Sequence, residues 1–123
     1  MITVTLYHDE ARNVSVFEYS GHAGYGNTGK DLVCAAASTL ASGTVNAIYH
    51  ITKVEPIIEK DDANGGYLRV ELPSESDLDA ETYKQVQLIV QVMTAQVYTL
   101  MNSYGAVGEF IKLDYQLVGG GQS

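Results

Sequence analysis

The sequence has little of several residue types, and each shortage excludes a kind of structure or site. Cys34 is the only cysteine among the 123 residues, so no disulfide can form within the chain and nothing indicates an oxidising compartment. There are only three histidines, and no group of Cys and His residues has the spacing of metal ligands. We therefore expect no metal site.

Basic residues are also few. Seven Lys and Arg stand against fifteen Asp and Glu, which gives a formal net charge of −8. This charge disfavours direct binding to nucleic-acid phosphates and to anionic membranes, whereas a basic polypeptide would be attracted. Residues 1–6 alternate between apolar and polar side chains and lack the basic segment and long apolar run of an export or membrane signal. We therefore expect a cytoplasmic protein without a nucleic-acid or membrane partner.

Hydrophobic periodicity predicts the order β-β-α-β-β-α-β. Apolar residues recur every three to four positions from Leu32 to Ile51, and again in a second helix that ends at Gly105. Alternating residues predict strands at 2–8, 14–20, 54–60, 67–72 and 110–118.

This order indicates an α+β fold. Two strand pairs are joined by short turns, one of them at residues 64–65, which predicts a two-layer sandwich with a mostly antiparallel sheet of about five strands and two main helices. The length and the 46% apolar content suit one domain, which we place at 1–118, followed by a flexible tail at 119–123.

Between the second strand and the first helix lies a glycine-rich segment that partly matches a phosphate-binding loop. Residues 24–31 read Gly-Tyr-Gly-Asn-Thr-Gly-Lys-Asp, and helix N-termini bind phosphate. However, Asp31 stands where such a loop has the Ser or Thr that ligates Mg²⁺, and the preceding strand belongs to a hairpin instead of a parallel β-α-β unit. Phosphate or nucleotide binding by residues 24–30 is therefore the weaker alternative.

The stronger hypothesis pairs His22 with Cys34, which flank this segment. If Asp31 caps the helix, Cys34 lies in the first turn, where the helix dipole and unpaired N–H groups stabilise a thiolate. His22 would serve as the base and then donate a proton to a leaving amine. Without the histidine and the cap, Cys34 would be better explained as a small apolar residue of a buried turn.

Three further residues have candidate supporting roles. Asp31 either orients the ring of His22 or caps the helix. Ser38 lies one turn after Cys34, where it can bond His22, the substrate or a helix carbonyl. The N–H of Gly21 is a candidate oxyanion-hole donor.

The segment itself is a candidate substrate loop. Tyr25 is placed either to close over a substrate side chain or to stay exposed in solvent. Three glycines tolerate backbone angles that other residues avoid, and so permit the loop to move: Gly24, Gly26 and Gly29.

Two stretches of sequence resemble the ribosomal-processing cysteine protease family (Prp, YsxB-like). These are Gly-His-Ala at 21–23 and Asp-Leu-Val-Cys-Ala-Ala-Ala-Ser at 31–38, and length and element order agree along essentially the whole chain. The resemblance implies a catalytic dyad of His22 and Cys34, accompanied by Asp31 and Ser38. No cofactor is implied.

The same resemblance implies a substrate and an assembly. The enzyme would remove the N-terminal extension of a basic large-subunit ribosomal protein, number twenty-seven, during ribosome maturation, and would act as a homodimer with a mobile loop. A non-catalytic ribosome-assembly adaptor that binds the same basic protein is the other alternative.

Overall fold

Five strands and two long helices follow one another in the predicted order. The structure, a computed structural model, describes residues 1–21, 28–61, 66–103 and 110–118, and for residues 28–31 it describes the backbone alone. The predicted turn at 64–65 and the tail at 119–123 lie outside the described residues. The elements are β1 (Ile2–His8), β2 (Val14–Ser20), α1 (Thr28–Thr52), β3 (Ile57–Asp61), β4 (Tyr67–Glu71), a 3-10 turn η1 (Glu75–Asp77), α2 (Ala80–Ser103) and β5 (Ile111–Leu117).

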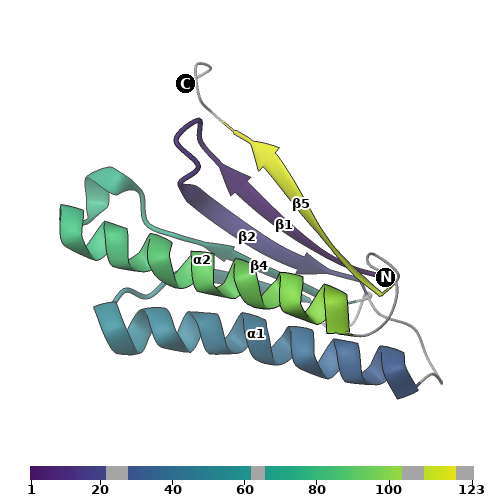
Figure 1. The fold of residues 1–123 in the computed structure, drawn as a ribbon. Coiled ribbons are helices and arrows are strands. Elements are labelled where there is room, and N and C mark those ends of the chain that lie inside the picture. Colours follow the sequence, from purple (N-terminus) through teal and green to yellow (C-terminus); the bar gives the residue numbers. More distant parts are fainter. Residues whose placement is uncertain (22–27, 62–65, 104–109, 119–123) are drawn as a thin grey trace.

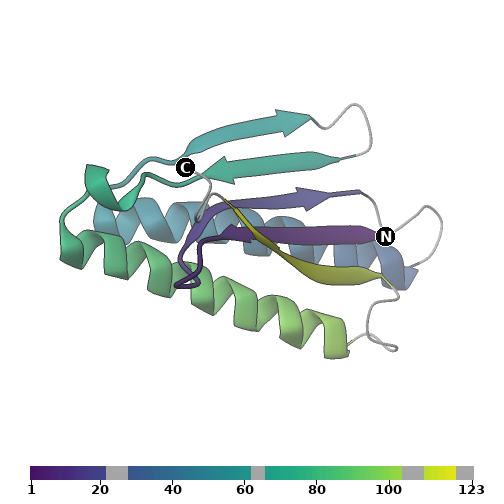
Figure 2. The same ribbon diagram turned by 90° about the horizontal axis from the view of Figure 1, so that it is seen from above.

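The strands form one sheet that is covered on one face. The strand order is β3-β4-β2-β1-β5, and all neighbours are antiparallel except β1 and β5, which run parallel. Figure 1 shows both helices on the same side of the sheet, and Figure 2 shows β3 and β5 at its two edges. A parallel pair requires a long crossover, which here includes α2. The predicted two-layer α+β fold with a mostly antiparallel sheet is confirmed.

The turn between β1 and β2 is fixed by its own hydrogen bonds. The N–H of Asp9 donates to the carbonyl of Asn13 over 3.0 Å, and the N–H of Asn13 donates to the Asp9 carboxylate over 2.9 Å. Arg12 has the left-handed backbone angle φ +71° that such a tight turn demands. This turn places the start of β1 beside the end of β2, at the same end of the molecule as the start of α1 (Figures 1 and 2).

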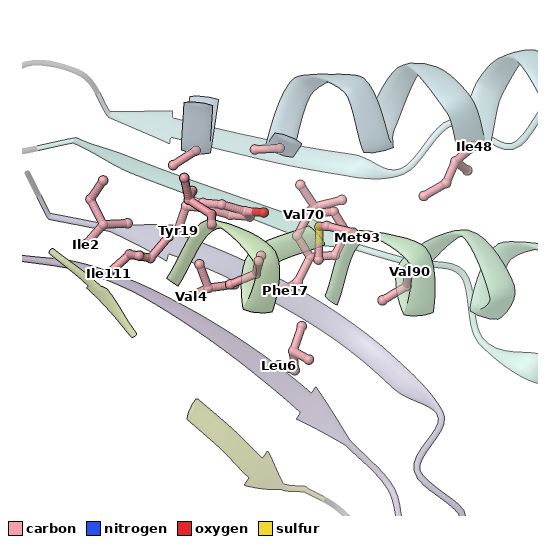
Figure 3. Close-up of a cluster of buried hydrophobic side chains, with 14 of the residues drawn as sticks. Ile2, Val4, Leu6, Phe17, Tyr19, Ile48, Val70, Val90, Met93 and Ile111 are labelled. Atoms are coloured by element: carbon pink, nitrogen blue, oxygen red, sulfur yellow. The ribbon is translucent and has the colours of Figure 1, made fainter. Parts of the chain in front are cut away.

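The hydrophobic core lies between the sheet and the two helices. Figure 3 shows Phe17 and Leu6 of neighbouring strands directed toward the helices, together with Val90 and Met93 of α2. Gln87 of α2 is also buried; its amide accepts from the N–H of Val14 and donates to the carbonyl of the same residue, both over 2.8 Å. Gln87 thus pairs with both backbone polar groups of Val14 at the start of β2, a role that hydrophobic periodicity cannot reveal.

Three local predictions are wrong. The first helix begins at Thr28 instead of Leu32, because the polar residues before the apolar face continue the same helix. Ile51, expected on its buried face, is 61% exposed, since periodicity identifies a face but not where the partner layer ends. The third strand begins at Ile57 instead of residue 54, and every residue in it is exposed, because β3 is an edge strand that the helices do not cover.

The segment Leu32–Thr52 of α1 is long and apolar enough to cross a membrane by length and composition alone. In the structure this segment packs on the sheet through Val33, Ala37, Ala41 and Ile48.

Candidate active site

Cys34 lies in α1 at the side of the helix that faces the end of β2. Its side chain is half-buried and touches the edge of the core without being covered by it. It lines a cleft of about 260 Å³ between α1 and the sheet. The other lining residues are Ile2, Tyr19, Ser20, Gly21, Ala37, Ser38, Ala41, Ser42, Lys60, Gly66, Tyr67 and Leu68. The thiol is therefore placed at a hollow surface, as a nucleophile requires.

The earlier start of α1 changes the electrostatic argument for Cys34. With Thr28 as the first helical residue, Asp31 is the fourth, so Asp31 is not the N-cap. Cys34 then lies in the second turn, where its N–H is paired within the helix instead of being one of the open donors of the first turn. The predicted first-turn position of Cys34 is wrong, and the helix dipole acts on its sulfur from farther away.

Ser38 lies one turn after Cys34 and lines the same cleft, as the helical spacing predicts. Its side chain is exposed, and its hydroxyl makes no hydrogen bond with the residues that the structure describes. By contrast, the neighbouring Thr39 donates to the carbonyl of Ala35 over 2.9 Å. The hydroxyl of Ser38 therefore faces the cleft without a bond to the helix backbone, which leaves it able to contact a bound peptide.

Gly21 directs the chain from the end of β2 along the rim of the cleft. Its φ is +93°, and a Cβ at this position would collide with the carbonyl oxygen of Met1, so glycine is required. Its N–H donates to the carbonyl of Gly66 over 2.9 Å. This donor is already used, and the expectation that it serves an oxyanion hole is wrong for this structure.

His22 lies outside the described residues. Gly21, the residue before it in the sequence, lines the cleft together with Cys34. The pairing of His22 with Cys34 stays a prediction.

The other predicted loop residues are placed only in part. Gly24, Tyr25 and Gly26 lie outside the described residues, and of Asp31 only the backbone is described. Gly29, expected in the loop, belongs to the first turn of α1. The segment between β2 and α1 is accordingly shorter than predicted, and the part played by Asp31 stays a prediction.

Sequence reasoning missed two polar residues that line the cleft, Tyr19 and Lys60. Tyr19 is 7% exposed, and its hydroxyl has no hydrogen-bond partner among the described residues. Burial raises the pKa of this hydroxyl, so it stays protonated. The alternation of β2 assigns Tyr19 to the buried face, but no signal in the sequence shows that its hydroxyl lacks a partner.

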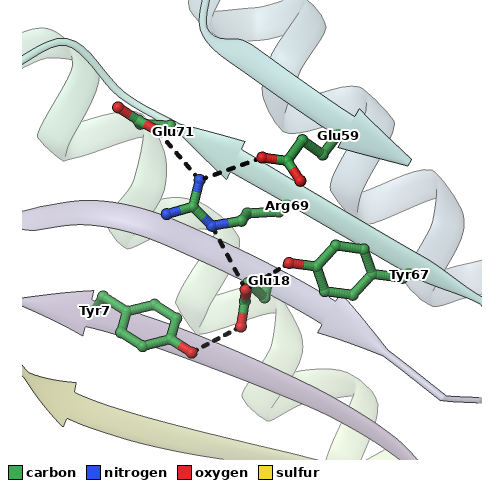
Figure 4. A network of polar contacts seen from close by, with 6 residues as sticks. All are labelled: Tyr7, Glu18, Glu59, Tyr67, Arg69 and Glu71. Carbon is green, nitrogen blue, oxygen red and sulfur yellow. Dashed lines mark hydrogen bonds and ion pairs between the residues drawn. The ribbon is translucent and has the colours of Figure 1, made fainter. Parts of the chain in front are cut away.

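The opposite face of the sheet has a separate polar network, shown in Figure 4. The carboxylate of Glu18 accepts hydrogen bonds from Tyr7 over 2.8 Å and from Tyr67 over 2.7 Å. Arg69 lies between three glutamates, with its shortest contact, 3.1 Å, to Glu71. These bonds raise the pKa of Tyr67 to about 12, chiefly through the hydrogen bond to Glu18. The network links β1, β2, β3 and β4, and of its members Tyr67 also lines the cleft, which indicates a mainly structural role.

Metal chemistry has no support in the described part of the chain, where no group of three His, Cys, Asp or Glu side chains is placed to hold an ion.

Comparison with known proteins identifies the family. The sequence model of the family described as cysteine protease Prp matches residues 1–108. The chain belongs to this family. It is a cysteine protease of the Prp family, which confirms the predicted resemblance and the predicted class of enzyme.

Individual relatives cover almost the whole chain. The ribosomal processing cysteine protease Prp of Staphylococcus aureus (strain Mu50 / ATCC 700699) is 35% identical over 116 residues, which are 94% of this chain and 100% of the relative. That of Bacillus subtilis (strain 168) is 32% identical over 104 residues, 85% of this chain and 90% of the relative.

Solved structures agree with the fold. Prp from S. aureus in complex with a covalently linked product peptide has a TM-score of 0.75 and 35% identity, covering 94% of this chain and all of that one. SMU.848 from Streptococcus mutans has a TM-score of 0.79 and 28% identity, covering 96% of each chain.

Proposed function

We propose that this chain removes the N-terminal extension of a basic large-subunit ribosomal protein, number twenty-seven, during ribosome maturation in the cytoplasm. Cys34 is the nucleophile and His22 is its base. The observation that carries the proposal is the position of Cys34 on a cleft whose rim is formed by Gly21, the residue before His22. The cleft runs along α1, which gives an extended peptide a surface to lie on.

In the proposed reaction the sulfur of Cys34 attacks the carbonyl carbon of the scissile bond. The C–N bond breaks as His22 gives its proton to the departing amine, and a thioester remains. Water then attacks the thioester, His22 takes the proton of that water, and the carboxylate product leaves. Asp31 orients the His22 ring, and the hydroxyl of Ser38 contacts the peptide.

Support for this substrate comes from the relatives and from charge. The curated relatives are named ribosomal processing cysteine proteases, and the S. aureus relative has been solved with a substrate peptide and with a covalently linked product peptide. The net charge of −8 suits attraction to a basic protein.

A digestion of the extended ribosomal protein, followed by mass spectrometry, tests the proposal. We expect one cleavage that removes the extension. Cys34→Ala should lower kcat/KM by at least about 1,000-fold, while its circular dichroism spectrum and Tm stay close to those of the parent. Wild-type rates from purified Cys34→Ala would refute the assignment of the nucleophile. Cleavage of other peptides but not of this protein would refute only the substrate.

Family membership favours the protease over the two alternatives from the sequence, and each alternative has its own test. A phosphate-binding module at residues 24–30 predicts that nucleotide raises the Tm, and we expect no change. A non-catalytic adaptor predicts that protein blocked at Cys34 by iodoacetamide keeps its full function, and we expect this treatment to abolish processing.

A homodimer is also part of the proposal, and the outer surface of the helix layer supports it. Residues 32–52 of α1 and 85–103 of α2 contain no Asp, Glu, Lys or Arg. Leu88 and Val92 of α2 are more than half exposed there. Two copies that each carry a charge of −8 repel one another least where their surfaces lack charge.

Val92→Asp tests this interface. We expect it to shift the protein from dimer to monomer in analytical ultracentrifugation, whereas Gln116→Asp, which adds the same charge on exposed β5, should leave the dimer intact. Equal effects of the two substitutions would contradict the placement of the interface.

A further inference from the structure

The sheet side of the cleft has a row of side chains that the reaction at Cys34 does not use. Leu68 of β4 is paired with Tyr19 of β2 on one side and with Lys60 of β3 on the other. Directly paired residues of neighbouring antiparallel strands point to the same face of a sheet. All three residues line the cleft. Two hydrogen-bond donors, a hydroxyl and an ammonium group, therefore lie on either side of one apolar side chain.

The hydroxyl of Tyr19 is buried without a partner among the described residues, which is unfavourable. The residue is 7% exposed, and none of the described residues bonds its oxygen. A buried polar group without a partner costs about 1–3 kcal/mol, so such groups are rare in folded proteins. Figure 3 shows the Tyr19 ring extending over the sheet within the core cluster, with its oxygen at the far end. A hydrogen-bond acceptor from outside the chain would remove this cost.

Lys60 is the other donor, and it makes no ion pair with the part of the chain that the structure describes. The cation of Arg69, in the neighbouring strand, instead meets three glutamates on the opposite face of the sheet. The direction of the Lys60 side chain toward the cleft face separates it from those carboxylates.

Small residues on α1 leave room above this row. Ala37, Ser38, Ala41 and Ser42 line the cleft after Cys34. Ser42 is eight residues beyond Cys34, which is about 12 Å along a helix, or the length of three to four residues of an extended peptide. A side chain that reaches the row therefore belongs to a residue within about four positions of the scissile bond.

We propose that Tyr19 and Lys60 form a specificity subsite that binds a side-chain carbonyl or carboxylate oxygen of the substrate, within about four residues of the cleaved bond. The inference rests on the proposed function of Cys34. Leu68 is half-buried and separates the two donors, so a rotamer change of Leu68 admits the side chain of the substrate. The Tyr19 hydroxyl then donates to the entering oxygen, and Lys60 adds a charge-assisted bond, strongest for a carboxylate.

Peptide cleavage kinetics test the subsite. The probes are peptides that span the cleavage site of the extended ribosomal protein, with Gln, Glu, Leu or Met placed in turn at each of the four positions on either side of the bond. At one position we expect wild-type enzyme to prefer Gln and Glu over Leu by about tenfold in kcat/KM. Tyr19→Phe should reduce this preference to about twofold, and Lys60→Met should remove mainly the preference for Glu.

Matched variants separate a subsite from a structural role. Because Tyr19→Phe removes an unpartnered buried hydroxyl, its Tm should equal or exceed that of wild type. Tyr7→Phe removes a hydroxyl that is bonded to Glu18 on the other face, so it should lower the Tm and leave the preference unchanged. Lys112→Met, on β5, is the corresponding control for Lys60.

The kinetic and thermal measurements each have a result that would refute the subsite. Three results would overturn the subsite. These are an unchanged preference in Tyr19→Phe, a Tm of Tyr19→Phe several degrees below that of wild type, and the absence of any preference for Gln or Glu in wild type. If no peptide is cleaved, the proposed function fails, and the subsite is judged separately by whether Gln and Glu peptides raise the Tm of wild type more than that of Tyr19→Phe. Equal shifts in the two proteins would then overturn it.

Discussion

Gly21 offers a sharp test of how the backbone positions the site, because Gly43 supplies a matched control. Gly21 has a φ of +93°, and an added Cβ would meet the carbonyl oxygen of Met1. The backbone angle alone costs a residue with a side chain about 1–2 kcal/mol, and the collision involves main chain that cannot rotate away. We therefore expect Gly21→Ala to lower the free energy of unfolding by about 2–4 kcal/mol.

Gly43 lies within α1, and a Cβ there would meet nothing within 4 Å. Alanine is the better helix former by about 1 kcal/mol. Gly43→Ala should therefore stabilise the protein by about 0.5–1 kcal/mol. The same substitution is thus expected to have opposite signs at the two positions.

Thermal and urea unfolding measure both variants. For a chain of this length, a change of 1 kcal/mol moves the Tm by about 4 °C. Gly21→Ala should therefore melt about 8–16 °C below wild type, and its kcat/KM should fall even at temperatures where it is fully folded, because the chain that leads to His22 starts from Gly21. A Gly21→Ala variant as stable and active as wild type would refute the reasoning from backbone geometry.

Two further predictions concern other polar groups. Gln87→Leu leaves the N–H and carbonyl of Val14 without their partner. It should lower the free energy of unfolding by about 2–4 kcal/mol, measured by urea unfolding. Gln91→Leu, at an exposed position of the same helix, is the control and should change this free energy little. The pKa of Tyr67 is raised from 10.0 to about 12, chiefly by its bond to Glu18. Because the folded-state pKa is the higher one, this contribution to stability is complete below pH 10 and is lost between about pH 10 and 12. Unfolding curves at about pH 9 and 11.5 should therefore differ less for Tyr67→Phe than for wild type, and an equal difference would contradict the assignment.

Much of the fold and part of the site could be predicted because they depend on local pattern. The alternation of β1 and β2, the turn between them and the long apolar face of α2 are read directly from neighbouring residues. The three-to-four-residue period correctly placed Cys34 and Ser38 on one side of α1. The start of α1 was predicted wrongly, because a helix continues through polar residues without any change in hydrophobic period.

By itself, the sequence determined the order of the elements, the absence of a disulfide within the chain, the charge and the pairing hypothesis for His22 and Cys34. Only the tertiary structure decided that β5 runs parallel to β1 and that the N–H of Gly21 is already bonded. It alone aligned Tyr19 and Lys60 in one row on the cleft-facing side of the sheet. The physical reason is that periodicity reports which face of an element is apolar, whereas strand register and hydrogen-bond partners are set between residues far apart in the chain.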